Sequence, residues 1–170
     1  MIDFVKIPEE RIKMLKADPR IQKKFEELCQ CKLQLNEQEQ EVQIECDDGL
    51  MMLKAKDVLK AFGRGFSSDD ALYLLDDDYY LEIINITEFV GKDKDRVKTM
   101  KGRLIGAEGH SKKTIEKDTN CKTAIYGKSI SIIGKWDDVL AAKKVVLRLL
   151  YGSKHSTVYR MLEERKKFKG

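Results

Sequence analysis

Apolar residues recur along the chain with two different spacings, that of a β-strand and that of an α-helix. These spacings appear in the same order in both halves. In the second half, Tyr79–Ile86 is a short apolar run rich in residues that favour β-strands. In the charged segment that follows it, Val97, Met100 and Leu104 recur at the spacing of an α-helix. A pair of glycines interrupts this helical pattern, which then resumes at once. The sequence therefore predicts a strand followed by two helices with a glycine break between them.

The remainder of the second half adds a further helix and a pair of strands. The resumed helix runs from Ser111 to about Asp118, and the runs 121–127 and 128–134 then show the alternation of two strands. The stretch 135–152 carries one apolar stripe of a long helix, made by Val139, Ala142, Val146 and Leu149. The order strand, helix, helix, strand, strand, helix predicts a three-stranded antiparallel sheet packed by helices, which is an α+β fold.

The first half repeats this unit. When the chain is slid against itself by 90 positions, residues 15–35 align without a gap on residues 105–125. Cys31-Lys32 falls on Cys121-Lys122, and polarity is kept where identity is lost. We therefore expect two copies of one unit of roughly 70 to 75 residues. The counterpart segments of the first copy are Phe4–Ile7, Glu9–Leu15, Pro19–Cys29, Lys32–Asn36, Val42–Cys46 and Leu50–Phe62.

This organisation predicts four segments in the chain. Residues 1–65 form the first copy, and residues 66–78 form a helical linker that starts at a serine cap. Residues 79–152 form the second copy, which holds the glycine break. Residues 153–170 form a C-terminal basic helix.

The two halves carry opposite charge. Residues 1–80 hold 12 lysines and arginines against 18 acids, a net charge of −6, and the remaining residues hold 21 against 11, a net charge of +10. Such an asymmetry favours a second half that faces nucleic acid and a first half with another use. Ordinary scatter in surface charge is the alternative explanation.

The glycine break is the strongest candidate for a binding site. A glycine inside a helix costs about 1 kcal/mol relative to alanine, so a bare backbone at Gly106 and Gly109 needs a reason. Without Cβ atoms, these residues let a sugar–phosphate chain pass close to the backbone. The N-terminus of the next helix attracts phosphate through its free N–H groups. Aspartate at both glycines is expected to abolish RNA binding and to leave the fold intact.

Thirteen residues around this break are the predicted RNA-binding residues. The aliphatic side chains would form the floor on which bases lie, and the lysines and the arginine would meet phosphates. Glu108 does not fit this scheme, because an acid weakens phosphate binding. The set comprises Arg103, Ile105, Gly106, Ala107, Glu108, Gly109, His110, Ser111, Lys112, Lys113, Ile115, Lys122 and Ile125.

The first copy lacks these features. Lys16, Ala17, Asp18 and Pro19 stand where the glycine break would be. The acid and the missing glycines disfavour close approach of a phosphate, and the proline fixes the start of the next helix. We therefore expect a degenerate copy that serves packing or a protein partner.

Other classes of protein find little support. The chain has no phosphate-binding P-loop, zinc-protease motif or nucleophile elbow, so we expect no enzyme and no catalytic residue. The four cysteines form no C-x-x-C pair, so we expect no metal site and no cofactor. No apolar run reaches the ~20 residues of a membrane helix, and the N-terminus does not resemble a signal peptide. These observations favour a cytoplasmic protein that does not interact with membranes.

The stretch "LIGAEGHSKKTIEKDTNCKTAIYGKSISIIG" resembles the core of a KH domain of the eukaryotic arrangement, or type I. The resemblance implies two type I KH domains in tandem, of which the first lacks the GxxG loop. In KH domains this loop clamps the backbone of about four nucleotides of single-stranded nucleic acid.

A degenerate KH unit, a helical linker and an intact GxxG unit together resemble one family, the Dim-two or partner-of-Nob-one ribosome-assembly factors in their short archaeal form. The resemblance extends from about Val5 to Tyr159. It implies binding of single-stranded small-subunit (16S-type) rRNA near its 3′ end, within the pre-ribosome, and assistance to the endonuclease that processes that end. It also suggests association with the α subunit of a translation initiation factor.

Two other functions remain open at the level of the sequence. A KH regulator of messenger RNA or of other RNA would use the same chemistry on a different target. A KH scaffold would use both units for protein contacts only, although the +10 charge of the second half argues against it.

Overall fold

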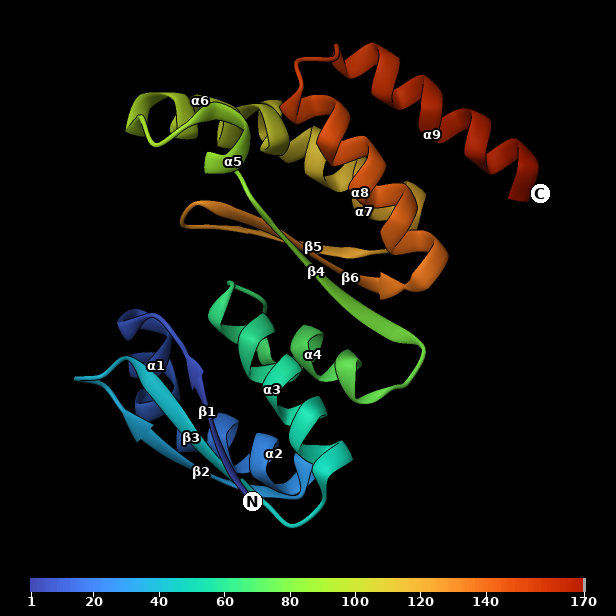
Figure 1. Ribbon diagram of the computed structural model, residues 1–170. Helices are drawn as coiled ribbons and strands as arrows, with labels where there is room; N and C mark the ends of the chain where they lie inside the picture. The colour runs from blue at the N-terminus through green and yellow to red at the C-terminus, as the bar shows by residue number, and fades with distance from the viewer. Residues whose placement is uncertain (170) are drawn as a thin grey trace. The chain divides into compact units, whose positions relative to one another are not determined.

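The computed structural model describes residues 1–169 and divides the chain into two compact units, Met1–Tyr79 and a second that starts at Tyr80 (Figure 1). Each unit holds a three-stranded sheet with helices packed on it, so the predicted α+β class is confirmed. Gly170, the last residue of the predicted C-terminal helix, lies outside the described residues. Among residues 1–169, no helix combines the length and the apolarity needed to cross a bilayer.

The first unit follows the predicted order of elements. Its strands pair antiparallel in the order β1-β3-β2, with Val5 opposite Val42 and Leu33 opposite Ile44 on the face that packs against the helices. Phe25 and Phe62 meet edge-to-face in the core, with ring centroids 5.6 Å apart. The elements are β1 (Ile2–Lys6), α1 (Glu9–Ala17), α2 (Pro19–Cys29), β2 (Cys31–Asn36), β3 (Glu41–Cys46) and α3 (Gly49–Gly63).

A buried arginine holds the end of α3 and the segment after it. The guanidinium of Arg11 donates hydrogen bonds to the carbonyl oxygens of Phe62 (2.8 Å) and Phe66 (2.6 Å). It also lies 4.2 Å from the centroid of the Phe62 ring, in a cation–π contact. Arg11 is only 9% exposed, so water has little access to this site. The guanidinium therefore supplies the hydrogen-bond donors that the two carbonyl oxygens need. The chain that leaves α3 is thus fixed to α1.

The segment 66–78, predicted as a helical linker, is helical over residues 68–75 and belongs to the first unit. They form α4 (Ser68–Ala71) and the 3₁₀ helix η1 (Leu72–Leu75), which pack against α3 through the buried Ala71 and Leu74. Lys54 of α3 donates to the carbonyl oxygen of Leu75 (3.0 Å) and forms an ion pair with Asp77 (2.6 Å). The run of three aspartates is therefore a turn tied to α3.

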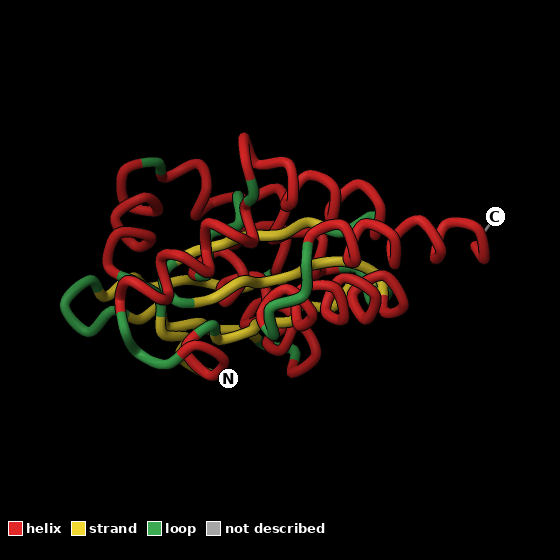
Figure 2. The backbone as a smooth tube through the Cα atoms, turned by 90° about the horizontal axis from the view of Figure 1, so that it is seen from above, coloured by secondary structure: helices red, strands yellow, loops and turns green. Residues whose placement is uncertain are grey.

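The second unit repeats the order with additions. Its sheet has the order β4-β6-β5, with β5 and β6 antiparallel. Figure 2 colours the helices, strands and loops along the backbone. The core is aliphatic, and Ile86, Leu104 and Ile132 are fully buried in it. The elements are β4 (Tyr79–Asn85), α5 (Thr87–Val90), α6 (Lys94–Ile105), η2 (Ala107–Gly109), α7 (His110–Thr119), β5 (Lys122–Tyr126), β6 (Ser129–Lys135), α8 (Trp136–Leu150) and α9 (His155–Lys169).

Two elements go beyond the repeat. The single turn α5 follows β4 directly, and the long helix α9 packs against α7 and α8. Arg165 of α9 forms an ion pair with Asp138 and donates to the carbonyl oxygen of Asp118 (3.1 Å). Lys166 forms a 2.7 Å ion pair with Asp118, and this hydrogen bond raises the pKa of Lys166. Part of the basic charge of α9 is thus neutralised where the helix packs.

Candidate nucleic-acid interface

The glycine break forms a tight loop between α6 and α7. Gly106 ends α6 with φ 77° and ψ 171°, and its N–H donates to the carbonyl oxygen of Gly102 (2.8 Å). Glu108 and Gly109 both have positive φ angles, 55° and 75°, which an L side chain adopts only at a cost. The N–H of Gly109 donates back to the carbonyl oxygen of Gly106 (3.1 Å), which closes the turn.

The two glycines serve different purposes. A Cβ atom on Gly106 would lie 2.7 Å from both the backbone nitrogen and the Cβ of Ser111, so the start of α7 could not stay where it is. A Cβ atom on Gly109 would meet only the end of Lys113, at 3.6 Å. The expectation that aspartate at both glycines leaves the fold intact is therefore wrong at Gly106. The first glycine is required by packing, and the second by its backbone angle alone.

The loop presents a short exposed ledge. Ala107, Glu108 and His110 are exposed, while Gly106 and Gly109 are half-buried. Two predicted contact residues do not reach the surface, since Ser111 is 0% and Ile115 is 1% exposed. The prediction that these two residues contact RNA is corrected, because both anchor α7 to the core.

The two predicted contact lysines of α7, Lys112 and Lys113, each have a partner. Lys112 forms an ion pair with Glu116 (3.0 Å), whose second carboxylate oxygen accepts the N–H of Thr123 (3.0 Å) and so ties α7 to β5. Lys113 donates to the carbonyl oxygen of Glu108 across the loop, at 3.4 Å. Lys122 of β5 is exposed, and Ile125 is half-buried against the core. Lys113 and Lys122 are thus the more available cations of the predicted set.

A groove next to the loop is lined by several lysines. In the sequence these lysines alternate with acids, a pattern that is typical of an ordinary solvated helix face. It has a volume of about 440 Å³ and lies between one face of α6 and the turn between β5 and β6. Apolar Val97 and Ile105 lie among five lysines, and Ile105 also joins the groove to the loop. The groove is lined by Lys92, Lys94, Val97, Lys98, Lys101, Gly102, Ile105, Gly127 and Lys128.

A signal for this groove was present in the sequence. Lys94, Lys98, Lys101 and Ile105 are spaced by four, three and four positions, which places them on one face of a helix. The acids of the same segment, such as Asp95, occupy other faces of the helix. Basic and acidic residues that alternate along the sequence therefore lie on different faces of α6.

The C-terminal helix fixes both ends of the loop. The guanidinium of Arg103, a predicted RNA contact, donates to the carbonyl oxygen of Ser153 (2.6 Å). The ring Nε2 of His155 hydrogen-bonds the carbonyl oxygen of Arg103 (2.9 Å). On the far side of the loop, His110 packs edge-to-face on Tyr159, with centroids 5.5 Å apart. The Arg103 side chain is thus held by the segment just before α9, and sequence periodicity could not show this contact across 50 residues.

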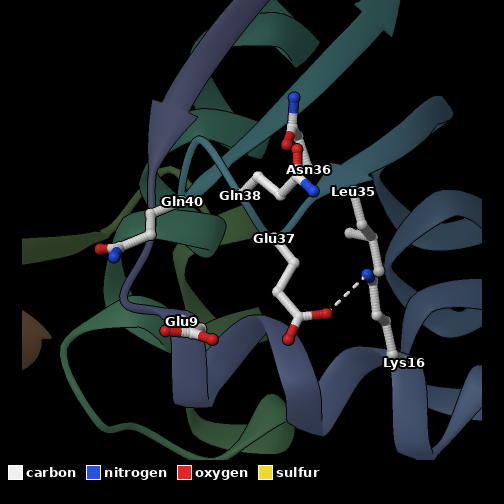
Figure 3. Close-up of a pocket in the computed structure, with 7 residues that line it drawn as sticks. All are labelled: Glu9, Lys16, Leu35, Asn36, Glu37, Gln38 and Gln40. Atoms are coloured by element: carbon white, nitrogen blue, oxygen red, sulfur yellow. Dashed lines mark hydrogen bonds and ion pairs between the residues drawn. The ribbon is translucent and has the colours of Figure 1, made fainter.

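The first unit has a groove of different character (Figure 3). It has a volume of about 680 Å³ and is lined by Glu9, Lys16, Leu35, Asn36, Glu37, Gln38 and Gln40. Its lysine, Lys16, forms a 2.8 Å ion pair with Glu37 across the groove, and this hydrogen bond lowers the pKa of Glu37. At the neighbouring helix junction, the carboxylate of Asp18 accepts the N–H of Arg20 and caps α2. Among the described residues that line this groove, none offers a cation without a partner.

Replacing Gly106 by alanine should lower the free energy of unfolding by about 2–4 kcal/mol, because the new Cβ atom meets the backbone of Ser111 and φ is positive. Gly109→Ala is the matched control, since φ is equally positive but the space is open, and it should cost about 1 kcal/mol. Urea unfolding followed by circular dichroism measures both. Equal losses of stability in the two variants would contradict the packing role of Gly106.

Comparisons with known proteins agree with this architecture. Residues 80–167 match a family of domains described as the eukaryotic type KH-domain, or KH-domain type I. The chain is 35% identical to the KH domain-containing protein MJ0443 of Methanocaldococcus jannaschii, over 99% of this chain and 76% of that protein. It is 28% identical to the pre-rRNA-processing protein pno1 of Aspergillus fumigatus, over 91% of this chain but only 64% of that protein.

A solved structure extends the likeness to three dimensions. The chain matches a component of the a/eIF2alpha–aDim2p–rRNA complex of Pyrococcus horikoshii with a TM-score of 0.90 and 36% identity. The match covers 99% of this chain and 95% of that one. The GxxG loop, the type I order of elements and the likeness over the full chain lead to one assignment. The chain belongs to the PNO1/Dim2 family of KH-domain proteins.

Proposed function

We propose that this protein binds single-stranded RNA in its second unit and acts in ribosome assembly on the 3′ end region of small-subunit rRNA. The observation that carries the proposal is the continuity of the glycine loop with a groove that combines an apolar floor and five lysines. Single-stranded RNA offers both a phosphate backbone and unstacked bases, and this groove has a surface suited to each.

The chemistry of binding divides between the loop and the groove. The ledge at Ala107 and Gly109 admits a phosphate close to the backbone, and the first turn of α7 contributes the positive end of its dipole. Bases can rest on Ile105, whose side chain is 37% exposed, while Lys98 and Lys101 neutralise the phosphates that follow. None of these contacts requires a metal or a cofactor, and we propose a binding protein rather than an enzyme.

The relatives support the identity of the target. The matched structure is that of a complex with rRNA and the α subunit of an initiation factor, and the fungal relative is named for pre-rRNA processing. We extend both to this chain, with the initiation-factor subunit as a partner. Assistance to the processing endonuclease within the cytoplasmic pre-ribosome follows from the family resemblance and belongs to the same proposal.

Crosslinking in cells, followed by mapping of the bound RNA, tests the target. The proposal expects crosslinks concentrated near the 3′ end of the small-subunit rRNA. Crosslinks spread over messenger RNAs would favour a KH regulator of messages. An absence of RNA crosslinks, with recovery of protein partners alone, would favour a scaffold.

Reversing two charges in the groove, Lys98→Glu with Lys101→Glu, should weaken binding of a short single-stranded RNA by at least tenfold at physiological salt. The slope of log affinity against log salt should also become shallower, by about 0.7 for each phosphate that the protein no longer neutralises. Fluorescence anisotropy measures both quantities. Lys144→Glu, an exposed charge reversal on α8, is the control for a change of charge outside the groove and should leave the affinity nearly unchanged. Unchanged binding by the double variant would exclude the groove.

Removing the acid of the loop should tighten binding. Glu108→Gln abolishes a negative charge on the ledge, so affinity should rise roughly two- to fivefold at low salt and less at high salt. Glu108→Gly should add the relief of an unfavourable φ angle, visible as a gain in stability. Glu88→Gln, an exposed acid of the same unit, is the control. A lack of response to Glu108→Gln would show that phosphates do not pass this ledge.

A further inference from the structure

The first unit gathers three cysteine thiols at one end of its sheet. Cys29 ends α2, Cys31 begins β2 and Cys46 ends β3, and they are 2%, 8% and 2% exposed. All three are free thiols, and no cluster among residues 1–169 is arranged to hold a metal ion. Nothing in the proposed RNA binding uses them.

Backbone hydrogen bonds define how two of these cysteines face each other. Cys31 and Cys46 are direct partners in the antiparallel ladder of β2 and β3. The N–H of Cys46 donates to the carbonyl oxygen of Met1 (3.0 Å), and its own carbonyl accepts from the terminal ammonium of Met1 (2.9 Å). Both backbone groups of Cys46 therefore point away from β2. In the ladder between β2 and β3, Cys31 and Cys46 therefore form a non-hydrogen-bonded pair.

This position suits a disulfide bond. In non-hydrogen-bonded antiparallel pairs the Cα atoms lie about 4.5 Å apart and the side chains are closest. Disulfides span Cα separations of about 4.4–6.8 Å, so the strands need not move to be joined. Because Cys31 and Cys46 lie at strand ends, local opening there costs less than in the centre of the sheet.

A pocket leads to this pair. Cys31 lines a small polar pocket of about 270 Å³, which gives small molecules a path to the two facing thiols. Burial raises the pKa of Cys46 to about 11, and a hydrogen bond from Cys31 lowers the pKa of Cys29.

We propose that Cys31 and Cys46 close into a reversible cross-strand disulfide when a peroxide oxidises this pair. The thiolate of one cysteine attacks the peroxide, whose O–O bond breaks, to give a sulfenic acid and, after protonation, water. The sulfur of the facing cysteine then displaces the second oxygen as water and forms the Cys31–Cys46 disulfide. In total, two thiols and one hydrogen peroxide give one disulfide and two waters.

The consequence is a covalent link between the start of β2 and the end of β3. The link closes a short loop in the unfolded chain and lowers its entropy, so the first unit should resist heat better when oxidised. The increase in its Tm should be roughly 10 °C. This property is independent of whether the second unit binds RNA.

Oxidation of the full chain by hydrogen peroxide tests the proposal. The intact mass should fall by about 2 Da through loss of two hydrogens, and non-reducing digestion should yield one peptide pair joined through Cys31 and Cys46. The Tm should rise, and dithiothreitol should reverse both changes. Cys46→Ala should abolish the cross-strand bond and the rise in Tm, while Cys121→Ser, in the second unit, should leave both intact. A final bond between Cys29 and Cys31 would overturn the proposal.

Cys29→Ser tests whether the third thiol is needed and does not require Cys46 to be altered. Because Cys31 and Cys46 face each other directly, this variant should still form the same bond and show the same rise in Tm. A folded Cys29→Ser protein that stays fully reduced after prolonged oxidation would contradict direct pairing of Cys31 with Cys46.

Discussion

The second unit depends on the contact between the Cα of Gly106 and the backbone of Ser111. Any side chain at Gly106 would have its first carbon 2.7 Å from that backbone, so the close approach of α6 and α7 exists only because this residue has none. Ser111 is completely buried, and Ala107 and Glu108, which lie between the two helices, are exposed. The proposed binding surface thus depends on helix packing as well as on loop chemistry.

The two units share the same core order of strands and helices, and they differ in the side chains at the junction that holds the GxxG loop in the second unit. In the second unit, the groove beside the helix junction exposes lysines around an apolar floor. In the first unit, the corresponding junction is closed by the Asp18 cap, and an ion pair between Lys16 and Glu37 spans the groove. Since the folds agree, the difference in function that we propose would lie in a few side chains at equivalent places.

The sequence predicted the elements well because local patterns encode them. The apolar stripe of α8, the strand alternation around Gly127 and the 90-residue repeat are all properties of neighbouring or regularly spaced residues. The site was harder to predict, because burial depends on distant contacts. Ile115 has the character of a groove floor but lies in the core, and Arg103 is held by Ser153, 50 positions further on. The lysines of α6 were visible but could not be assigned to a groove until the turn of the facing strands was in place.

The grip of α9 on the loop couples two places that are far apart in the chain. His155 and Tyr159 touch the residues just before and just after the glycine loop. If α9 were displaced, these two contacts would be lost, and the affinity of the loop for its proposed RNA ligand would change with them. Thermodynamic linkage would then require that occupation of the loop change the packing free energy of α9 by the same amount.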